Sequence, residues 1–140
     1  MLRTDSDYSL QDSMPRPKPS KTIPLVRLRE ICLALPSAYE QVAWGSPTFR
    51  VRGGKMFAMS HDNHHGDRRV AIWCKSTFND QDLMVRSDPK RFFIPPYVGP
   101  SGWVGVRLDL RPNWETILEV IEAAYRLAAP KRLLAGLRRS

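Results

Sequence analysis

Positively charged side chains recur at alternate positions in several short segments of this sequence. In a β-strand every second residue lies on the same face, so the cations of one segment share a face if that segment is a strand. A guanidinium group pairs with a phosphate through two parallel hydrogen bonds, and an ammonium group binds it as a point charge. The pattern therefore indicates a surface that binds phosphate groups. Its cations are Arg50, Arg52, Arg69, Lys75 and Arg107.

Two tryptophans, Trp73 and Trp103, fall on the same alternating faces as these cations. Indole rings stack on nucleobases, so cations interleaved with aromatic rings are typical of nucleic-acid-binding surfaces. Lys55 and Arg68 extend the pattern at neighbouring turns. The predicted nucleic-acid-binding residues are Arg50, Arg52, Lys55, Arg68, Arg69, Trp73, Lys75, Trp103 and Arg107. The alternative is that these cations only solvate the outer face of a sheet whose tryptophans are covered by a proline-rich loop.

The stretch HDNHHGDR, which begins at His61, contains residue types that bind zinc. Imidazole and carboxylate groups are good ligands for that ion. However, His64 and His65 are adjacent and point in different directions on a loop, and the HExxH spacing of a zinc-binding helix is absent. Asn63 and Gly66 are ordinary turn residues. The stretch is therefore predicted to be a solvated hairpin tip, and no metal site is expected.

No residue has the setting of a catalytic nucleophile or general acid. The sequence lacks a GxSxG motif, and Cys32 and Cys74 have neither CxxC spacing nor an evident histidine partner. Gly53-Gly54-Lys55 lacks the other residues of a phosphate-binding loop. Asp80 and Asp82 belong to the start of a helix, where carboxylates favour the helix dipole. We therefore expect no catalytic residue and no cofactor, and we do not expect an enzyme.

The overall charge agrees with the alternating cations. The 140 residues carry a formal net charge of +8, and a positive field attracts nucleic-acid backbones, anionic lipid headgroups or acidic proteins. Part of this charge lies in the last ten residues, where a solvated tail is the simplest explanation. The residues of this tail are Lys131, Arg132, Arg138 and Arg139.

The ends and the apolar runs of the chain bear on its location. No apolar run approaches the roughly 20 residues that cross a bilayer, and the N-terminus lacks the apolar segment of a secretory signal. A cytoplasmic protein without a membrane partner is expected. Residues 1–21 are polar, contain prolines and have no periodicity, so they predict a flexible leader. Residues 22–140 are predicted to form a single domain of ordinary size.

Apolar periodicity predicts a helix at each end of this domain, with strands between them. The first helix begins near Thr22 and is ended by Pro36, and the last is capped by Asn113 and broken at Pro130. Residues 79–85 predict a short helix. Alternating segments predict strands at residues 40–44, 48–52, 55–60, 69–75 and 103–110.

This order of elements predicts an α+β fold, because the strands follow one another as hairpins rather than alternating with helices. We expect one antiparallel sheet with helices on one face and the other face partly open to water. Gly53-Gly54 marks the tightest hairpin, since glycine allows a positive φ at both central positions. The stretch Arg91–Asp109, RFFIPPYVGPSGWVGVRLD, is either a rigid rim over the open face or a constrained crossover whose Phe92, Phe93 and Tyr97 fill the core.

Four segments of the sequence share their order and spacing with a known family. They are LREICLALPSAYEQVAWGSPTFRVRGGKMFAMS, VAIWCK, DPKRFFIPPYVGPSGWVGVRLD and WETILEVIEAAYRLAAPKRL. In these segments the chain resembles the MmcQ/YjbR family, over nearly everything from Leu25 to Leu137. The most specific features are WG.PTFRV..GK.FA after LP, and GWVGVRLD after PPYVG. The stretch HDNHHGDR departs from the family pattern.

The resemblance implies an α+β fold similar to that of bacterial frataxin homologues and secretion chaperones. It also implies DNA binding through two hairpin wings. The leading hypothesis is thus a DNA-binding protein without enzymatic activity, whose contacts are mostly to phosphate and largely independent of base sequence. The alternative is a protein-partner module in which the same open sheet binds an acidic peptide or subunit.

Overall fold

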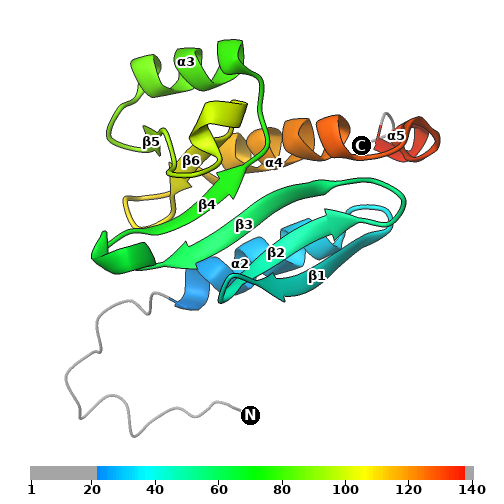
Figure 1. The fold of residues 1–140 in the computed structure, drawn as a ribbon, viewed down its shortest axis with the longest axis horizontal. Helices are drawn as coiled ribbons and strands as arrows, with labels where there is room; N and C mark the ends of the chain where they lie inside the picture. The colour runs from blue at the N-terminus through cyan, green and yellow to red at the C-terminus, as the bar shows by residue number, and fades with distance from the viewer. Residues whose placement is uncertain (1–21, 138–140) are drawn as a thin grey trace, which may run out of the picture.

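The structure is a computed structural model that describes residues 22–137. The predicted flexible leader, residues 1–21, and residues 138–140 of the predicted domain lie outside the described residues. Two short 3-10 turns, η2 (His64–Gly66) and η3 (Gly99–Ser101), interrupt the loops. The main elements (Figure 1) are α2 (Thr22–Leu33), β1 (Ala38–Ala43), β2 (Ser46–Val51), β3 (Met56–Asp62), β4 (Val70–Cys74), α3 (Phe78–Ser87), β5 (Phe92–Phe93), β6 (Val104–Arg107), α4 (Trp114–Ala128) and α5 (Lys131–Leu137).

The six strands form one antiparallel sheet in the order β1-β2-β3-β4-β6-β5. The first four strands follow one another as neighbours, which is the hairpin succession that the alternating segments predict. The chain then leaves the sheet through α3 and returns at its edge, where β5 pairs with the outer side of β6. The predicted α+β fold with a single antiparallel sheet is confirmed. Within the described residues, no helix is long and apolar enough to cross a bilayer.

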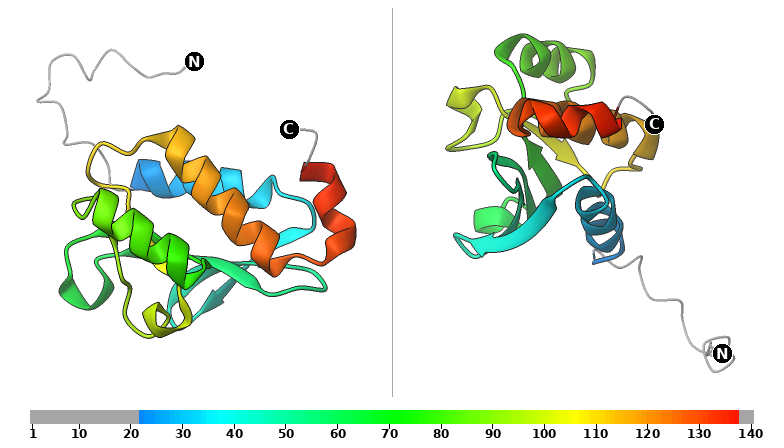
Figure 2. Two further views of the ribbon diagram at one scale, coloured as in Figure 1. Left: turned by 90° about the horizontal axis from the view of Figure 1, so that it is seen from above. Right: turned by 90° about the vertical axis from the view of Figure 1, so that its right-hand side faces the viewer.

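The main hydrophobic core lies between the sheet and two helices, α2 and α4, which cover the same face (Figure 2). Tyr125 of α4 is fully buried and meets the Phe57 ring edge-on, at 5.7 Å between centroids. Its hydroxyl donates a hydrogen bond to the carbonyl oxygen of Pro36, at 2.6 Å. This bond ties α4 to the turn that ends α2, so both helices are fixed to the sheet at one point.

Helix α4 begins and ends where the sequence predicts. The Asn113 side chain accepts a hydrogen bond from the Thr116 backbone N–H at 3.3 Å, and this satisfies one of the N–H groups that a helix start leaves unpaired. At the other end Ala129 is extended, as expected for the residue before Pro130. The chain then turns into α5, whose Leu137 is buried in the main core. The last residues of the described chain are therefore a packed helix.

The β2–β3 hairpin differs from its prediction in detail. The Val51 N–H donates to the Lys55 carbonyl at 3.2 Å, which leaves three residues in the loop. Only Gly53 has a positive φ, so the prediction that both glycines lie in the left-handed region is wrong. Gly54 is needed for another reason: a Cβ there would collide with the Ala128 carbonyl oxygen, which accepts a hydrogen bond from the Lys55 N–H at 3.0 Å. The hairpin tip therefore packs against the end of α4.

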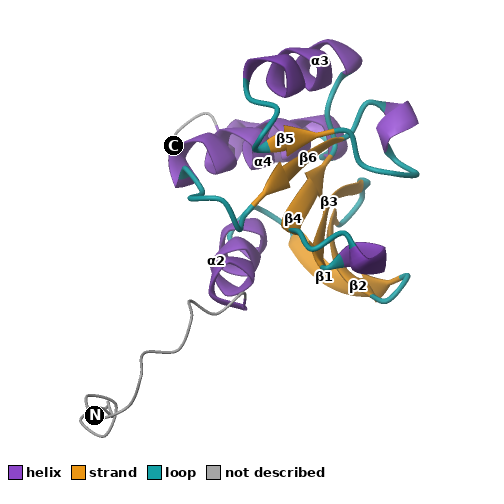
Figure 3. Cartoon of the chain, turned by 90° about the vertical axis from the view of Figure 1, so that its left-hand side faces the viewer, coloured by secondary structure: helices purple, strands orange, loops and turns teal. Residues whose placement is uncertain are grey.

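The second face of the sheet is covered in its middle instead of being open to water. A separate apolar cluster of Met59, Ala71, Trp73 and Trp103 is buried there, with Phe93 and Val98 packed against it. The Phe93 ring lies on Gly105, where a Cβ would collide with it. Figure 3 shows the two 3-10 turns on the side of the sheet away from α2 and α4. The partly open face that the sequence predicts is therefore closed in its middle, because β4 and β6 present large apolar side chains there, and its margins stay in contact with water at the half-buried Arg50 and Lys75.

The stretch Arg91–Asp109 combines the two interpretations that its sequence allows. Phe92 is buried in the main core and Phe93 packs on the second face, as a constrained crossover requires. Tyr97 is 76% exposed and does not fill the core. The stretch is thus anchored by its phenylalanines and presents its tyrosine at the surface.

Helix α3 fixes this stretch through one buried side chain, Gln81. Its Nε2 donates to the carbonyl oxygens of Gly99, at 3.0 Å, and Trp103, at 2.6 Å. The side chain of Thr77 caps the same helix by accepting from the Asp80 N–H at 3.1 Å. Gln81 therefore couples the position of α3 to the loop that covers the second face.

The substitution Gln81→Ala is expected to lower the free energy of unfolding by about 1–3 kcal/mol, because it removes the side-chain donor to the Trp103 carbonyl and one of the two donors to the Gly99 carbonyl, which keeps the Gly102 N–H. Asn79→Ala, at an exposed position of the same helix, is the matched control and should change it by less than about 0.5 kcal/mol. Urea denaturation of both variants measures the difference. Equal stabilities for the two variants would show that Gln81 does not hold the loop.

Candidate functional site

The nine predicted binding residues divide into seven cations with exposed or half-buried side chains and two tryptophans in the interior. Trp73 is 2% exposed and Trp103 is 5% exposed. The prediction that both indole rings face water is wrong, because Phe93 and Val98 pack over the cluster that contains them. Neither ring offers an open surface for stacking. The cations are Arg50, Arg52, Lys55, Arg68, Arg69, Lys75 and Arg107.

Strand register separates the cations of the second face. Met59 and Trp73 are Cα partners in the middle of the sheet. Arg50 pairs with Met56, toward one end of the face. Arg107 lies toward the other end, beside the start of β4. The cations therefore flank an apolar strip and do not form the single charged plane that alternation predicts.

Arg107 carries a charge that is already compensated. Its Nε and Nη2 donate to the two carboxylate oxygens of Asp109, at 3.1 and 2.9 Å. These hydrogen bonds raise the pKa of Arg107. A guanidinium held in this bidentate pair has little left to offer a phosphate. Arg107 is therefore removed from the candidate interface. The sequence analysis included it because the sequence alone does not show that Asp109, two residues further on, turns back to pair with it.

The other six predicted cations have no ion-pair partner among residues 22–137. Two of them lie over aromatic rings instead: Arg52 over Tyr39, at 4.8 Å from the ring centroid, and Arg69 over Phe93, at 4.1 Å. Such a contact positions the guanidinium group but leaves its charge uncompensated. These groups remain available to an anionic partner.

Arg132 joins the predicted cations at the tip of the β2–β3 hairpin. Its guanidinium lies against Gly53, between Arg52 and Lys55 in the hairpin sequence. We call Arg52, Lys55 and Arg132 the basic hairpin cluster. The sequence assigns Arg132 to a solvated tail; the residue is exposed, but it lies on α5, a helix that packs back on the domain. No local signal could have found it, since the contact depends on how α4 meets the hairpin.

A pocket that the sequence does not predict lies over the second face, with a volume of about 450 Å³. Its lining contains no lysine, arginine, aspartate or glutamate. We call it the aromatic hollow. Two of its aromatic side chains, Trp44 and Tyr97, are each 76% exposed. The full lining is Trp44, Met56, Met59, His61, His64, His65, Trp73, Tyr97 and Val98.

His61 lies in the wall of the aromatic hollow and is only 6% exposed. The prediction that the histidine stretch is a solvated hairpin tip is therefore wrong for this residue: β3 continues to Asp62, and the His61 ring packs on Trp73 at 3.8 Å between centroids. Its Nδ1 lies 3.1 Å from the Ser46 hydroxyl oxygen. Burial, and secondarily the positive charge of His64, lowers the pKa of His61 to about 4. The ring is neutral at pH 7.

Two buried nitrogen atoms in this wall have no hydrogen-bond partner. They are Nε2 of His61 and Nε1 of Trp73. An unpaired buried polar atom costs about 1–3 kcal/mol. Such atoms are uncommon in folded proteins, and each exposes less than 1 Å² here, so a molecule in the pocket would reach them only after a shift of the side chains around them.

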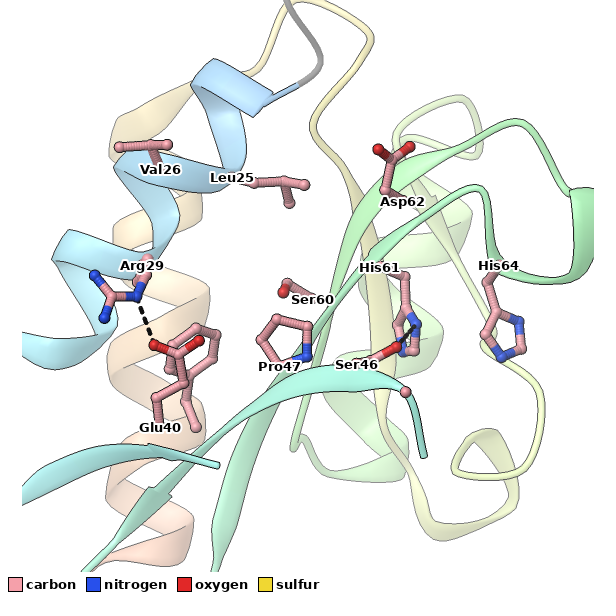
Figure 4. A pocket seen from close by; sticks show the side chains of 12 residues that line it. Leu25, Val26, Arg29, Glu40, Ser46, Pro47, Ser60, His61, Asp62 and His64 are labelled. Carbon is pink, nitrogen blue, oxygen red and sulfur yellow. Dashed lines mark hydrogen bonds and ion pairs between the residues drawn. The ribbon is translucent and has the colours of Figure 1, made fainter. Parts of the chain in front are cut away.

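A second pocket, of about 410 Å³, lies on the other side of His61 (Figure 4). It opens between the first turns of α2 and the strands β2 and β3, with Leu25 and Val26 on the helix side. The Arg29 guanidinium donates to the Glu40 carboxylate across this pocket, at 2.5 Å. Because its one arginine is paired, this pocket offers less to an anion than the hairpin does.

The described part of the chain contains neither a group of side chains that could hold a metal ion nor a reactive thiol. No group of three histidine, cysteine, aspartate or glutamate side chains is placed to hold a metal ion there. His64 meets the rings of His61 and His65 edge-on instead, at 4.7 and 4.1 Å between centroids. Cys32 and Cys74 are free and buried, and burial raises the pKa of both thiols. A thiol in this state is a poor nucleophile.

Comparison with known proteins agrees with this architecture. A family model described as YjbR matches residues 33–127 of the chain. The fold is similar to that in a crystal structure of a Deinococcus radiodurans protein with a DUF419 domain, at a TM-score of 0.63 and 19% sequence identity. This similarity covers 74% of this chain and 76% of the other, and it bears on the fold alone. No curated protein matches the chain.

The pKa of His61 makes stability depend on pH in a defined direction. Below its ordinary value of 6.5 the unfolded chain takes up a proton at His61 that the folded protein takes up only near pH 4. Stability is therefore lost as the pH falls from about 6.5 to about 4, by about 3 kcal/mol from this residue. His64, whose pKa is lowered by burial and by His65, adds a loss of the same sign.

His61→Asn removes the titrating ring and keeps an amide that can reach Ser46, so it should lose less stability than the wild type between pH 7 and pH 4. His65→Asn, at an exposed position of the same turn, is the control: it removes only the smaller influence of His65 on the rings of His61 and His64, so its pH slope should stay closer to that of the wild type than the slope of His61→Asn does. Urea midpoints at several pH values measure how much stability each variant loses between pH 7 and pH 4. An unchanged pH slope in His61→Asn would contradict the assignment.

Proposed function

This chain belongs to the YjbR family, and we propose that it is a DNA-binding protein without enzymatic activity whose main contacts are made by the cations of the β2–β3 hairpin. The observation that carries the proposal is the lack of carboxylate partners for these cations within residues 22–137. The segment Ser46–His61 itself contains no aspartate or glutamate. Unpaired cations gathered on one projecting element are what a phosphate backbone requires.

The arrangement of the hairpin supports this proposal. Its tip is held against α4 by the hydrogen bond from the Lys55 N–H to the Ala128 carbonyl. A rigid tip loses little conformational freedom on binding, so its charges contribute more to affinity than those of a mobile loop. Arg50, on β2, and Lys75, at the end of β4, extend the cationic surface from the basic hairpin cluster along the sheet.

Phosphate contacts of this kind give affinity without much discrimination between base sequences. Non-specific DNA binding has dissociation constants of roughly 1–100 µM at physiological salt, and each phosphate contact makes the affinity more sensitive to salt. The cytoplasm, where the sequence leads us to expect this protein, is the compartment we propose for this function.

An acidic peptide or protein subunit is the other class of partner that the same cations would attract. A peptide has carboxylates in place of phosphates and lacks the regular charge spacing of DNA. Competition between DNA and polyglutamate therefore distinguishes a DNA-binding site from a site for acidic peptides. DNA that is displaced only by a large excess of polyglutamate indicates recognition of a phosphate backbone, whereas equal competition indicates a general site for acidic polymers.

The double substitution Arg52→Gln with Lys55→Gln is expected to weaken DNA binding about tenfold at low salt, because two contacts of about 0.7 kcal/mol each are lost. The slope of log affinity against log salt concentration should become shallower by about 2. Fluorescence anisotropy with labelled duplex and single-stranded DNA measures both quantities.

The matched control is Arg86→Gln with Lys90→Gln, which removes the same charge from the end of α3 and the turn after it. It should leave the affinity within about twofold and change the salt slope little. If both double variants weaken binding equally, only the net charge matters and the hairpin is not the site. No binding below about 100 µM at low salt removes the proposal altogether.

A further inference from the structure

The aromatic hollow has the size and lining of a site for a small planar molecule. Its volume of about 450 Å³ falls within the roughly 300–1,000 Å³ of ordinary ligand pockets. Aromatic rings and the thioethers of Met56 and Met59 make favourable contacts with the face of a planar ring. Because no lysine, arginine, aspartate or glutamate lines the hollow, the lining favours a ligand whose inserted part is uncharged.

The two open aromatic side chains of the hollow have unusual backbone conformations. Trp44 has a φ of 54° and Tyr97 a φ of 66°, both in the left-handed region. Bulky side chains rarely occupy this region, and backbone strain of this kind gathers at functional sites. The two residues come from separate loops, the β1–β2 turn and the crossover before η3. In both loops, therefore, a strained backbone conformation presents an aromatic ring to solvent at the same pocket.

The unpaired nitrogen atoms specify what the ligand must carry. Nε1 of Trp73 is a donor and requires an acceptor. Nε2 of His61 is a donor or an acceptor according to the ring tautomer, and its Nδ1 already faces Ser46. A planar ring with acceptor and donor groups along one edge satisfies both atoms once the side chains that enclose them shift. Nucleobases have this combination of a π face and a polar edge.

A cation stands beside the hollow where the phosphate of such a nucleotide would lie. Arg50 is the Cα partner of Met56, one of the lining residues. Its Nε donates to the Thr48 hydroxyl at 3.0 Å, which holds the side chain, and it has no carboxylate partner among residues 22–137. Arg50 also lies two residues before Arg52, which belongs to the basic hairpin cluster. The hollow and the hairpin cations are therefore neighbours on two adjacent strands, β3 and β2.

We propose that the aromatic hollow holds one unstacked nucleobase of a single-stranded nucleic acid, stacked against Trp44 and Tyr97 with its polar edge toward Trp73 and His61. The proposal rests on the proposed function, because it makes the hairpin cations the phosphate contacts of the same strand. Single strands are favoured over duplex, since a paired base would first have to be unstacked. A free nucleotide has the same chemistry, so the experiment must separate the two sources.

The experiment uses the full chain and a short single strand that carries one 2-aminopurine, whose emission changes on stacking. Binding should change this emission, while the matching duplex should leave it unchanged at equal occupancy. Trp44→Ala and Tyr97→Ala should each weaken single-strand binding about tenfold, because stacking on one aromatic ring contributes about that factor for each base. Trp44→Phe keeps a ring and should retain most of the affinity.

Phe78→Ala is the matched control, because Phe78 is a 60% exposed aromatic residue on α3, away from the lining. It should bind like the wild type. Trp44 and Tyr97 are exposed, so their loss should leave the thermal unfolding temperature within a few degrees, and this is measured first. A nucleoside monophosphate titrated against the intrinsic tryptophan fluorescence provides the arm for a free ligand.

The outcomes separate the two proposals. If the strand binds but the 2-aminopurine emission and the Trp44→Ala affinity stay unchanged, the base-binding hollow is wrong and hairpin binding to phosphate remains. If the monophosphate binds and no strand does, a free nucleotide is the ligand, and both the single-strand proposal and the proposed function fail. Binding of neither overturns both.

Discussion

The burial of Trp73 in the middle of the second sheet face is the constraint on which the functional surfaces depend. A buried indole of this size must be covered, and α2 and α4, which cover the sheet, lie on its other face. The cover comes from Val98 in the crossover, from Phe93 over Gly105 and from the His61 ring on β3. This cover is incomplete, and the aromatic hollow is the space that it leaves.

A second packing contact decides which cations can act together. The absence of a side chain at Gly54 lets the β2–β3 hairpin approach the end of α4 closely enough for the Ala128 carbonyl to bond the Lys55 N–H. The α4–α5 turn at Pro130 then brings Arg132 against Gly53. Three cations from two distant parts of the chain meet for this reason. Their mutual repulsion is tolerated at a solvent-exposed tip, where water screens it.

The two surfaces differ in the kind of binding that they favour, and they meet where Arg50 of β2 pairs with Met56 of β3. The basic hairpin cluster attracts any polyanion over distances near the Debye length, about 8–10 Å in physiological salt. The aromatic hollow acts only at contact and selects for a planar ring with a polar edge. Arg50 lies between them, beside Met56. A partner that carries both phosphates and exposed bases would use the whole strand, whereas an acidic peptide would use only its cationic end.

Most of the fold follows from local sequence, because its elements are specified by periodicity and by turn chemistry. Alternating segments give the strands, Asn113 and Pro130 bound α4, and the hairpin succession gives an antiparallel sheet. The two-residue β5 was not predicted, since so short a strand has no period of its own and forms only because β6 is there to pair with it. The longer elements are specified by residues that are neighbours along the chain, so the sequence alone could predict them.

The candidate site depends on contacts between distant residues, which local sequence does not encode. Alternation correctly groups Arg50, Trp73 and Arg107 on one face, but it cannot tell whether that face is covered or whether Asp109 turns back to pair with Arg107. The aromatic hollow draws its lining from β3, β4 and three separate loops. The sequence by itself determined which side chains share a face. Only tertiary packing decided which of them meet water, because burial is set by whatever the rest of the chain places on top.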